Sequence, residues 1–190
     1  MPGPEDILSF WLDEVGPSDW YTSDPELDAR IRDRFEATWH GAMEGRYALW
    51  LTYPSGALAY IILVDQFSRN MFRGEARSFS ADAVALAAAK QAIARGWDLR
   101  IDPPARQFFY LPLMHSENLC DQDRCVRLMN ERLSGTDNLL HAKAHREEIR
   151  LFGRFPARNT ALDRRSTGPE IAYVENGGYG KTLRALQEPA

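Results

Sequence analysis

The sequence has few cysteines and no long apolar run, and both absences narrow the kind of protein it encodes. Only Cys120 and Cys125 occur among 190 residues. Five positions along a helix separate two residues by about 9 Å, which is too far for a disulfide, and this spacing fits no zinc pattern. We therefore expect two reduced thiols, in the core or half-buried, and no metal. The longest apolar run, residues 58–64, is far too short to span a membrane, so we expect no membrane partner.

Signals for export, for nucleic-acid binding and for cofactor binding are also missing. Glu5 and Asp6 stand where a signal peptide carries cations, and no Asn-x-Ser/Thr sequon argues for secretion, so the cytoplasm is the expected location. The net charge of -4 argues against nucleic acid as a partner. Residues 177–182 end like a phosphate-binding loop, but Glu175 stands where that loop needs glycine and no strand precedes it. We expect no cofactor.

Helix signals, in contrast, recur along the whole chain. Apolar residues at positions 27, 31, 35 and 39 form one stripe of a long helix that Asp24 caps. Other helices are predicted over residues 4–12, from residue 54 through the apolar run, and over 80–96, 102–112, 121–133, 137–152 and 168–174, where proline, serine, aspartate or threonine marks the start. The predicted fold is all-α, with about eight helices. We expect a single domain over residues 1–176 and a flexible tail over 177–190.

A dense polar cluster follows the most apolar helix. Helical spacing places Asp65, Arg69 and Arg73 on one stripe, with Gln66 and Asn70 beside it. If this end of the helix is buried, each polar group needs a partner, because an unpaired one costs about 1–3 kcal/mol. The structural alternative is an Asp–Arg pair of about 0.3–0.5 kcal/mol with Asn70 ending the helix.

Two further segments carry histidine. His115 and Glu117 follow the apolar run that includes Tyr110 and Pro112, and their imidazole and carboxylate suit an acid–base pair. The alternative is a core histidine at a helix end. His141 and His145 share one helical face, a spacing that can bind metal, but the pattern is not His-Glu-x-x-His, so it is weak evidence.

Six arginines stand between residues 145 and 165 against three acidic residues. Arginine suits planar, two-point recognition of carboxylate or phosphate. Arg154 and Arg158 lie beyond the helix stop at Gly153, with Asn159 next to them, and this position favours a binding site over a solvated helix face. The structural alternative is that they latch the turn to a buried carboxylate.

Four blocks of sequence resemble the bacterial family labelled domain of unknown function 924. They are ILSFW at 7–11, DQFSRNMFRG at 65–74, FFYLPLMHSEN at 108–118, and HREEIRLFGRFPARN at 145–159 with RRST at 164–167. The resemblance spans about residues 7–174 and implies helical hairpins stacked in a tetratricopeptide-like superhelix. The family pattern has histidine where this chain has Ala157, so a mechanism that needs that histidine is in doubt, whereas His115 and His145 match the pattern.

We therefore predict a binding module for a small anionic ligand or a peptide carboxylate, and the alternative is an acid–base hydrolase that uses His115 with Glu117 or His145 with Asp65. The sequence leaves the oligomeric state and any catalysed reaction open. The predicted ligand-binding residues are Asp65, Gln66, Arg69, Asn70, Arg73, Tyr110, His115, Glu117, His145, Arg154, Arg158 and Asn159.

Overall fold

Helices form all the regular structure in the computed structural model, which describes residues 1–133 and 136–187. The predicted all-α class is confirmed for these ranges. The chain divides into two compact units, unit 1 (Met1–Pro112) and unit 2 (Leu113–Ala190), each of which is described by itself. The single domain over 1–176 and the tetratricopeptide-like superhelix stay predictions.

Unit 1 begins with α1 (Pro4–Leu8), which continues as the π-helical segment η1 (Ser9–Val15), and with the long α2 (Pro25–Met43). Asp24 caps α2 as predicted, because its side chain accepts a hydrogen bond of 2.9 Å from the amide of Glu26. The stripe at residues 27, 31, 35 and 39 is buried along its length. It supplies one wall of an aromatic core in which Phe35 packs against Phe10 and Phe67.

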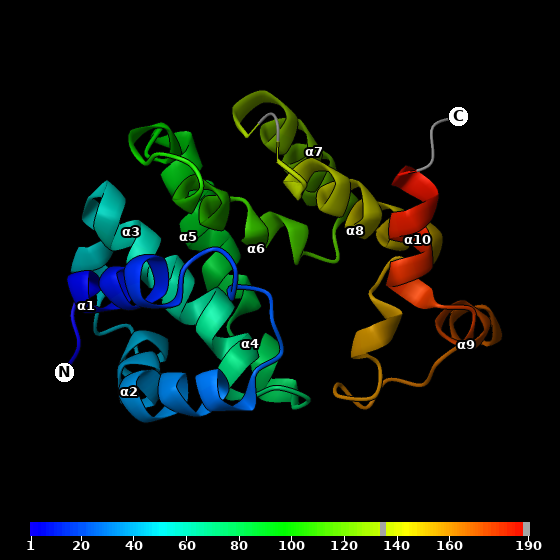
Figure 1. The fold of residues 1–190 in the computed structure, drawn as a ribbon, viewed down its shortest axis with the longest axis horizontal. Coiled ribbons are helices and arrows are strands. Elements are labelled where there is room, and N and C mark those ends of the chain that lie inside the picture. The colour runs from blue at the N-terminus through cyan, green and yellow to red at the C-terminus, as the bar shows by residue number, and fades with distance from the viewer. Residues whose placement is uncertain (134–135, 188–190) are drawn as a thin grey trace. The chain divides into compact units, whose positions relative to one another are not determined.

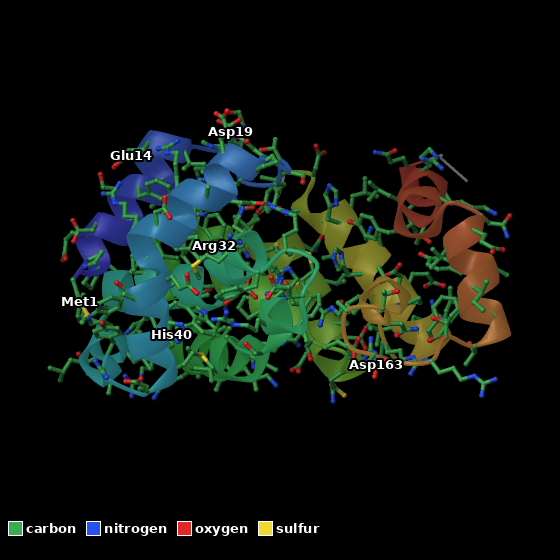
Figure 2. The ribbon with its side chains drawn as sticks, turned by 90° about the horizontal axis from the view of Figure 1, so that it is seen from below. Met1, Glu14, Asp19, Arg32, His40 and Asp163 are labelled. Carbon is green, nitrogen blue, oxygen red and sulfur yellow. The ribbon has the colours of Figure 1, made fainter. Side chains whose placement is uncertain are left out.

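The predicted central helix exists and is continuous from α3 (Pro54–Ile61) through η3 (Ile62–Gln66) to α4 (Phe67–Met71). Residues 57–64 are buried on every side, as their uninterrupted apolar character predicts. The middle segment, η3, is π-helical, which the sequence did not indicate. α4 packs against α2 (Figure 1), and Arg32 of α2, labelled in Figure 2, donates to the carbonyl of Met71 at the end of α4.

The remaining elements of unit 1 are η2 (Ala48–Thr52), η4 (Ala76–Phe79), α5 (Asp82–Ala94), η5 (Asp98–Arg100) and η6 (Ala105–Phe109). Two predicted boundaries are wrong here. Ser80 does not cap α5, because its hydroxyl donates back to the carbonyl of Arg77. The single helix predicted over 102–112 is replaced by η6 and the short α6 (Leu111–Met114), since two adjacent prolines, Pro103 and Pro104, disfavour a helical start.

Unit 2 contains α7 (Leu119–Arg132), α8 (Asn138–Phe152), η7 (Pro156–Arg158), α9 (Gly168–Glu175) and α10 (Gly178–Gln187). α7 lies along α8, and α10 packs against α8 as well (Figure 1). α8 ends at Gly153, whose φ of 69° is left-handed and favours glycine. The predicted capping box at the start of α9 is present, with Thr167 and Glu170 bonding each other's amides.

The segment from residue 177 onward, predicted as a flexible tail, contributes α10 through Gln187. The rest of that predicted tail, residues 188–190, lies outside the described residues. In the described part of the chain, no helix combines the length and apolar character that crossing a membrane requires.

Candidate functional site

The polar cluster after the apolar helix is split between two carboxylates. Arg69 pairs with Asp65 (Nη1 to Oδ1, 3.1 Å). Arg73 instead reaches α2, where it donates twice to Asp28 (Nε to Oδ2, 2.6 Å; Nη2 to Oδ1, 2.9 Å). The predicted single stripe of Asp65, Arg69 and Arg73 is therefore wrong. α4 ends at Met71, so Arg73 leaves the helical spacing that the prediction assumed.

Asn70 and Arg73 tie α4 to α2. Asn70 donates to the same carboxylate of Asp28 (2.8 Å). Burial by itself raises the pKa of Asp28, but the hydrogen bonds from Arg73 and Asn70 outweigh it and hold that pKa below its ordinary value. These contacts favour a structural role for Asn70 and Arg73.

Asp65, Gln66 and Arg69 form a second, deeper network. Asp65 is 1% exposed and accepts a bond of 2.5 Å from the Gln66 amide. Arg69 also reaches Asp82 at the start of α5 (2.9 Å). The π-helical η3 ends at this network, and π-helical turns are frequent at functional sites. Tyr110 lies elsewhere in unit 1, where its hydroxyl donates to the buried Asp98 (2.6 Å).

In unit 2, Glu117 is held by the loop that follows α8. Arg164 donates to both of its carboxylate oxygens (2.8 and 3.0 Å), and the amide of Phe155 donates to Oε1 (2.8 Å). Burial raises the pKa of Glu117, but these bonds outweigh it and hold the pKa below its ordinary value. Glu117 is thus an ionised partner of Arg164, which weakens its predicted pairing with His115.

Arg154 has the same kind of partner. Its Nε and Nη2 donate to the two oxygens of Glu170 on α9 (2.6 and 2.8 Å), and Glu170 is 2% exposed. The bonds from Arg154 and from the Thr167 amide lower the pKa of Glu170 to about 2. Asn159, also buried, accepts from Arg164 (3.0 Å) and donates to Ser166 (3.1 Å). This geometry favours the latch over a ligand-binding role for Arg154 and Asn159.

The loop of residues 159–167 carries Asn159, Arg164 and Thr167, and hydrogen bonds hold it at both ends. Asp163, labelled in Figure 2, lies in this loop and has a φ of 50°, a left-handed value that aspartate tolerates better than most residues. The amide of Arg164 then bonds the carbonyl of Asn159 (2.8 Å). The tight turn brings Arg164 back onto Glu117.

The three remaining predicted residues of unit 2, His115, His145 and Arg158, lie together, and we call them the binding cluster. The rings of His115 and His145 are 6.4 Å apart between centroids. Arg158 donates to the carbonyl of His115 (2.9 Å), and its guanidinium lies over the ring of Phe155 at 4.6 Å. The ring of Phe155 contacts His145 in turn (5.6 Å between centroids).

His145 is kept uncharged. Burial is the main cause that lowers its pKa to about 3; the hydrogen bond to the carbonyl of His141 opposes this, and His115, His141 and Arg158 lower the pKa further. Its Nδ1 lies 2.8 Å from the carbonyl of His141, and a carbonyl only accepts, so Nδ1 carries the proton and Nε2 carries a lone pair. A neutral imidazole of this kind accepts a hydrogen bond or acts as a base.

Sequence reasoning missed Tyr179, which contacts the binding cluster, and the bonded pair Glu148 and Tyr173. Tyr179 shares a hydrogen bond of 2.6 Å with Nδ1 of His141, and its ring lies against His145 (4.9 Å between centroids). Tyr173 donates to the buried Glu148 (2.9 Å). Burial raises the pKa of Glu148, although Tyr173 and Arg158 oppose this. Glu148 lies three residues after His145, and this helical spacing could have shown that the two side chains share a face. Tyr173 lies near the end of the predicted domain, and Tyr179 lies beyond it.

The predicted site residues thus fall into two sets of six, one in each unit. That the two sets form one pocket stays a prediction. His145 and Asp65, proposed as an acid–base pair, belong to different units. Ala157, at the position where the resemblance implies a histidine, is exposed in η7. Over the residues described, no three side chains of His, Cys, Asp or Glu are grouped closely enough to hold a metal ion.

Comparisons with known proteins give a family and no activity. The model of a bacterial protein family of unknown function, DUF924, matches residues 7–178. A solved structure of a protein of unknown function from Agrobacterium tumefaciens is similar to this chain, with 38% sequence identity and a TM-score of 0.87. The similarity covers 92% of this chain and 97% of that one. No match is found among curated proteins.

Proposed function

The chain belongs to the bacterial DUF924 family, and we propose that it binds a small anionic ligand, or the carboxylate end of a peptide, at the binding cluster. The observation that carries the proposal is the grouping of three side chains: the ring of His145 lies 6.4 Å from that of His115, and the guanidinium of Arg158 donates to the carbonyl of His115. Burying polar and ionisable groups costs stability unless they are fully paired, and such groups with shifted pKa values gather at functional sites.

The two groups suit different parts of one ligand. Arg158 provides a fixed positive charge that also acts on Glu117 and Glu148, so its field extends across the cluster. His145 offers a lone pair at Nε2 to a hydroxyl or amine hydrogen. A hydroxy acid or amino acid, which carries a carboxylate and a hydrogen-bond donor on adjacent carbons, combines both features.

Acid–base hydrolysis at the same cluster is the second candidate, and one observation favours it. Burial moves the pKa of His145 down and the pKa of Glu148 up, and pairs of groups pushed apart in this way can serve as base and acid. Both lie on α8, three residues apart. Esterase, phosphatase and phosphodiesterase substrates test this candidate, and any turnover must disappear in His145→Gln.

Thermal denaturation tests the binding proposal. A panel of simple anions (phosphate, sulfate, succinate and lactate) and the zwitterion glycine is added at matched ionic strength, with chloride as the reference. A ligand that binds only the folded state at a hundred times its Kd stabilises it by about 2.7 kcal/mol. We expect at least one hydroxy or amino carboxylate to raise the melting temperature.

Two substitutions show whether the effect comes from the cluster. Arg158→Gln should remove the ligand's effect, and Arg158→Lys should keep part of it. Arg150→Gln is the matched control, because Arg150 is 58% exposed and pairs only at the surface with Glu147. The proposal fails if no anion stabilises the wild type, or if Arg158→Gln responds as Arg150→Gln does.

A further inference from the structure

The helix α10 lies on the binding cluster and packs against α8, but its own side chains remain partly or fully exposed. None of its residues in the described range is buried. It contacts α8 along one side and α9 at its start. A cavity of about 470 Å³ remains open between α9 and α10, lined by Ala172, Tyr173, Thr182 and Leu186 among others. Few buried contacts are the mark of an element that opens before the rest of a fold.

Two side-chain hydrogen bonds fasten α10, and both lie in its first half. The hydroxyl of Tyr179 bonds His141 (2.6 Å). The hydroxyls of Thr182 and Tyr173 are 2.8 Å apart, and Tyr173 also donates to Glu148. The second half of the helix, residues 184–187, is exposed.

The joint before α10 has the conformation of a hinge. Gly177 has a φ of 101° and Gly178 a φ of 49°, both left-handed values that glycine adopts without strain. Two adjacent glycines also restrict the backbone less than any other pair, so the helix can swing about this joint while α9 stays in place. Hinges are commonly a few such residues at the ends of elements.

We propose that α10 is a displaceable cover of the binding cluster, and that Tyr179 occupies the place of a ligand's ring or hydroxyl group. This inference rests on the proposed function, whose site it regulates. The ring of Tyr179 lies against His145, and its hydroxyl is bonded to His141. A ligand that reaches His145 from this side displaces Tyr179, and α10 moves with it. Binding then includes an opening step. The apparent affinity falls in proportion to the fraction of molecules in which α10 is open.

Two variants separate a cover from a fixed wall. Tyr179→Phe removes the hydroxyl that bonds His141 and keeps the ring. Thr182→Val removes the second fastening without touching a histidine. One hydrogen bond changes an opening equilibrium by about fivefold. If α10 is a cover, both variants open it about fivefold more often; if Tyr179 is part of a fixed wall, Thr182→Val leaves the cluster unchanged.

Opening is measured without any ligand. Amide hydrogen exchange reports the opening of α10 against α8. Diethyl pyrocarbonate, which modifies neutral imidazole nitrogens, reports the access to His145 by mass spectrometry. His40, whose side chain is 54% exposed on α2 and is labelled in Figure 2, is the internal reference. We expect α10 to exchange at least tenfold faster than α8, and both variants to raise the modification rate of His145 relative to His40 about fivefold.

The proposal that α10 is a displaceable cover is wrong if α10 exchanges as slowly as α8, or if Thr182→Val leaves the modification of His145 unchanged. These outcomes do not depend on ligand binding, so they are distinct from a failure of the proposed function. Where an anion does bind, both variants should also tighten its apparent Kd about fivefold. Unchanged or weaker binding in Thr182→Val contradicts the cover even if the cluster is the binding site.

Discussion

Unit 1 and unit 2 are built on different kinds of interior. The largest fully buried side chains, among the residues described, all belong to unit 1, and they are aromatic rings and branched aliphatic chains between Ile7 and Tyr110. Unit 2 buries leucine, methionine and isoleucine side chains and Phe155, together with the polar residues Asp121, Gln122, Glu148, Asn159 and Glu170. Unit 1 also buries polar side chains, among them Asp65 and Asp98, but large apolar side chains dominate its interior. Unit 2 depends on polar groups that are paired with one another.

The paired polar groups of unit 2 support the proposal that the binding cluster lies in this unit. An apolar core needs only volume and shape, and it tolerates exchange among hydrophobic residues. A buried polar network is costly if any member loses its partner, so such a network is a poor way to gain stability alone. The arginine–glutamate pairs of unit 2 fix the loop after α8, and that loop positions Arg158 beside His115 and His145. We regard them as the frame of the binding cluster.

The largest effect should come from opening the core of unit 1. Phe67 is fully buried against Phe10, Trp11 and Phe35, so Phe67→Ala should lower the free energy of unfolding by about 3–5 kcal/mol. All five tryptophans lie in unit 1, and their fluorescence in urea therefore follows this unit. Leu99→Ala, at a residue 54% exposed, should change stability by less than about 0.5 kcal/mol. Equal losses of stability in the two variants would contradict the conclusion that apolar packing stabilises unit 1.

A smaller but still clear loss should follow from breaking an ion pair in unit 2. Arg164→Gln leaves the half-buried Glu117 without its guanidinium partner. Breaking a fully buried pair costs about 3–5 kcal/mol, and because both side chains are about a quarter exposed we expect about 2 kcal/mol. Arg150→Gln, at the exposed pair with Glu147, should cost less than about 0.5 kcal/mol.

Hydrogen exchange of α9 and of residues 155–166 is the readout for this pair of variants, because tryptophan fluorescence does not report on unit 2. Exchange should accelerate in Arg164→Gln and stay unchanged in Arg150→Gln. Similar exchange in the two variants would show that the paired carboxylates do not hold the loop.

The pH dependence of stability should show a still smaller contribution from His145. Its folded pKa of about 3 lies below the ordinary value of 6.5, so at acidic pH the unfolded chain takes up a proton that the folded chain does not. The folding stability linked to the neutral imidazole of His145 is fully present above pH 6.5. It is lost as the pH falls from 6.5 toward 3. Between pH 6.5 and 4.5 we expect a loss of about 1–2 kcal/mol.

The variant His145→Gln should remove this part of the slope, and His40→Gln, at an exposed ring, should leave it in place. Urea unfolding followed by circular dichroism at each pH measures the slope. An identical slope in wild type and His145→Gln would mean that the imidazole is not held neutral in the folded chain.

The sequence predicts the helices where local chemistry determines them. The stripe from Leu27 to Trp39, the cap at Asp24, the stop at Gly153 and the capping box at Thr167 are all signals within one or two turns, and the structure confirms each of them. α10 was missed because its glycines suggest a loop, whereas its helix is stabilised by contact with α8.

The candidate site was harder to predict, because its partners are distant in sequence. Arg73 and Asp28 are 45 residues apart, and Arg164 and Glu117 are 47 residues apart. Residue type alone does not show that Arg154 and Arg164 bind the internal carboxylates of Glu170 and Glu117. The π-helical η3 and the end of α4 at Met71 also changed the register that the predicted Asp65–Arg73 stripe needed.

The most direct test of the central claim is a titration observed at the four histidines by nuclear magnetic resonance. The chain has only His40, His115, His141 and His145, so single substitutions to glutamine assign the ring resonances. The anion that stabilises the protein most is added at constant pH and ionic strength. The binding cluster predicts shifts at His115, His145 and His141 that saturate with one Kd, no shift at His40, and loss of all shifts in Arg158→Gln. Shifts of His40 equal to those of His145, or saturation that Arg158→Gln leaves unchanged, would contradict a binding site at this cluster.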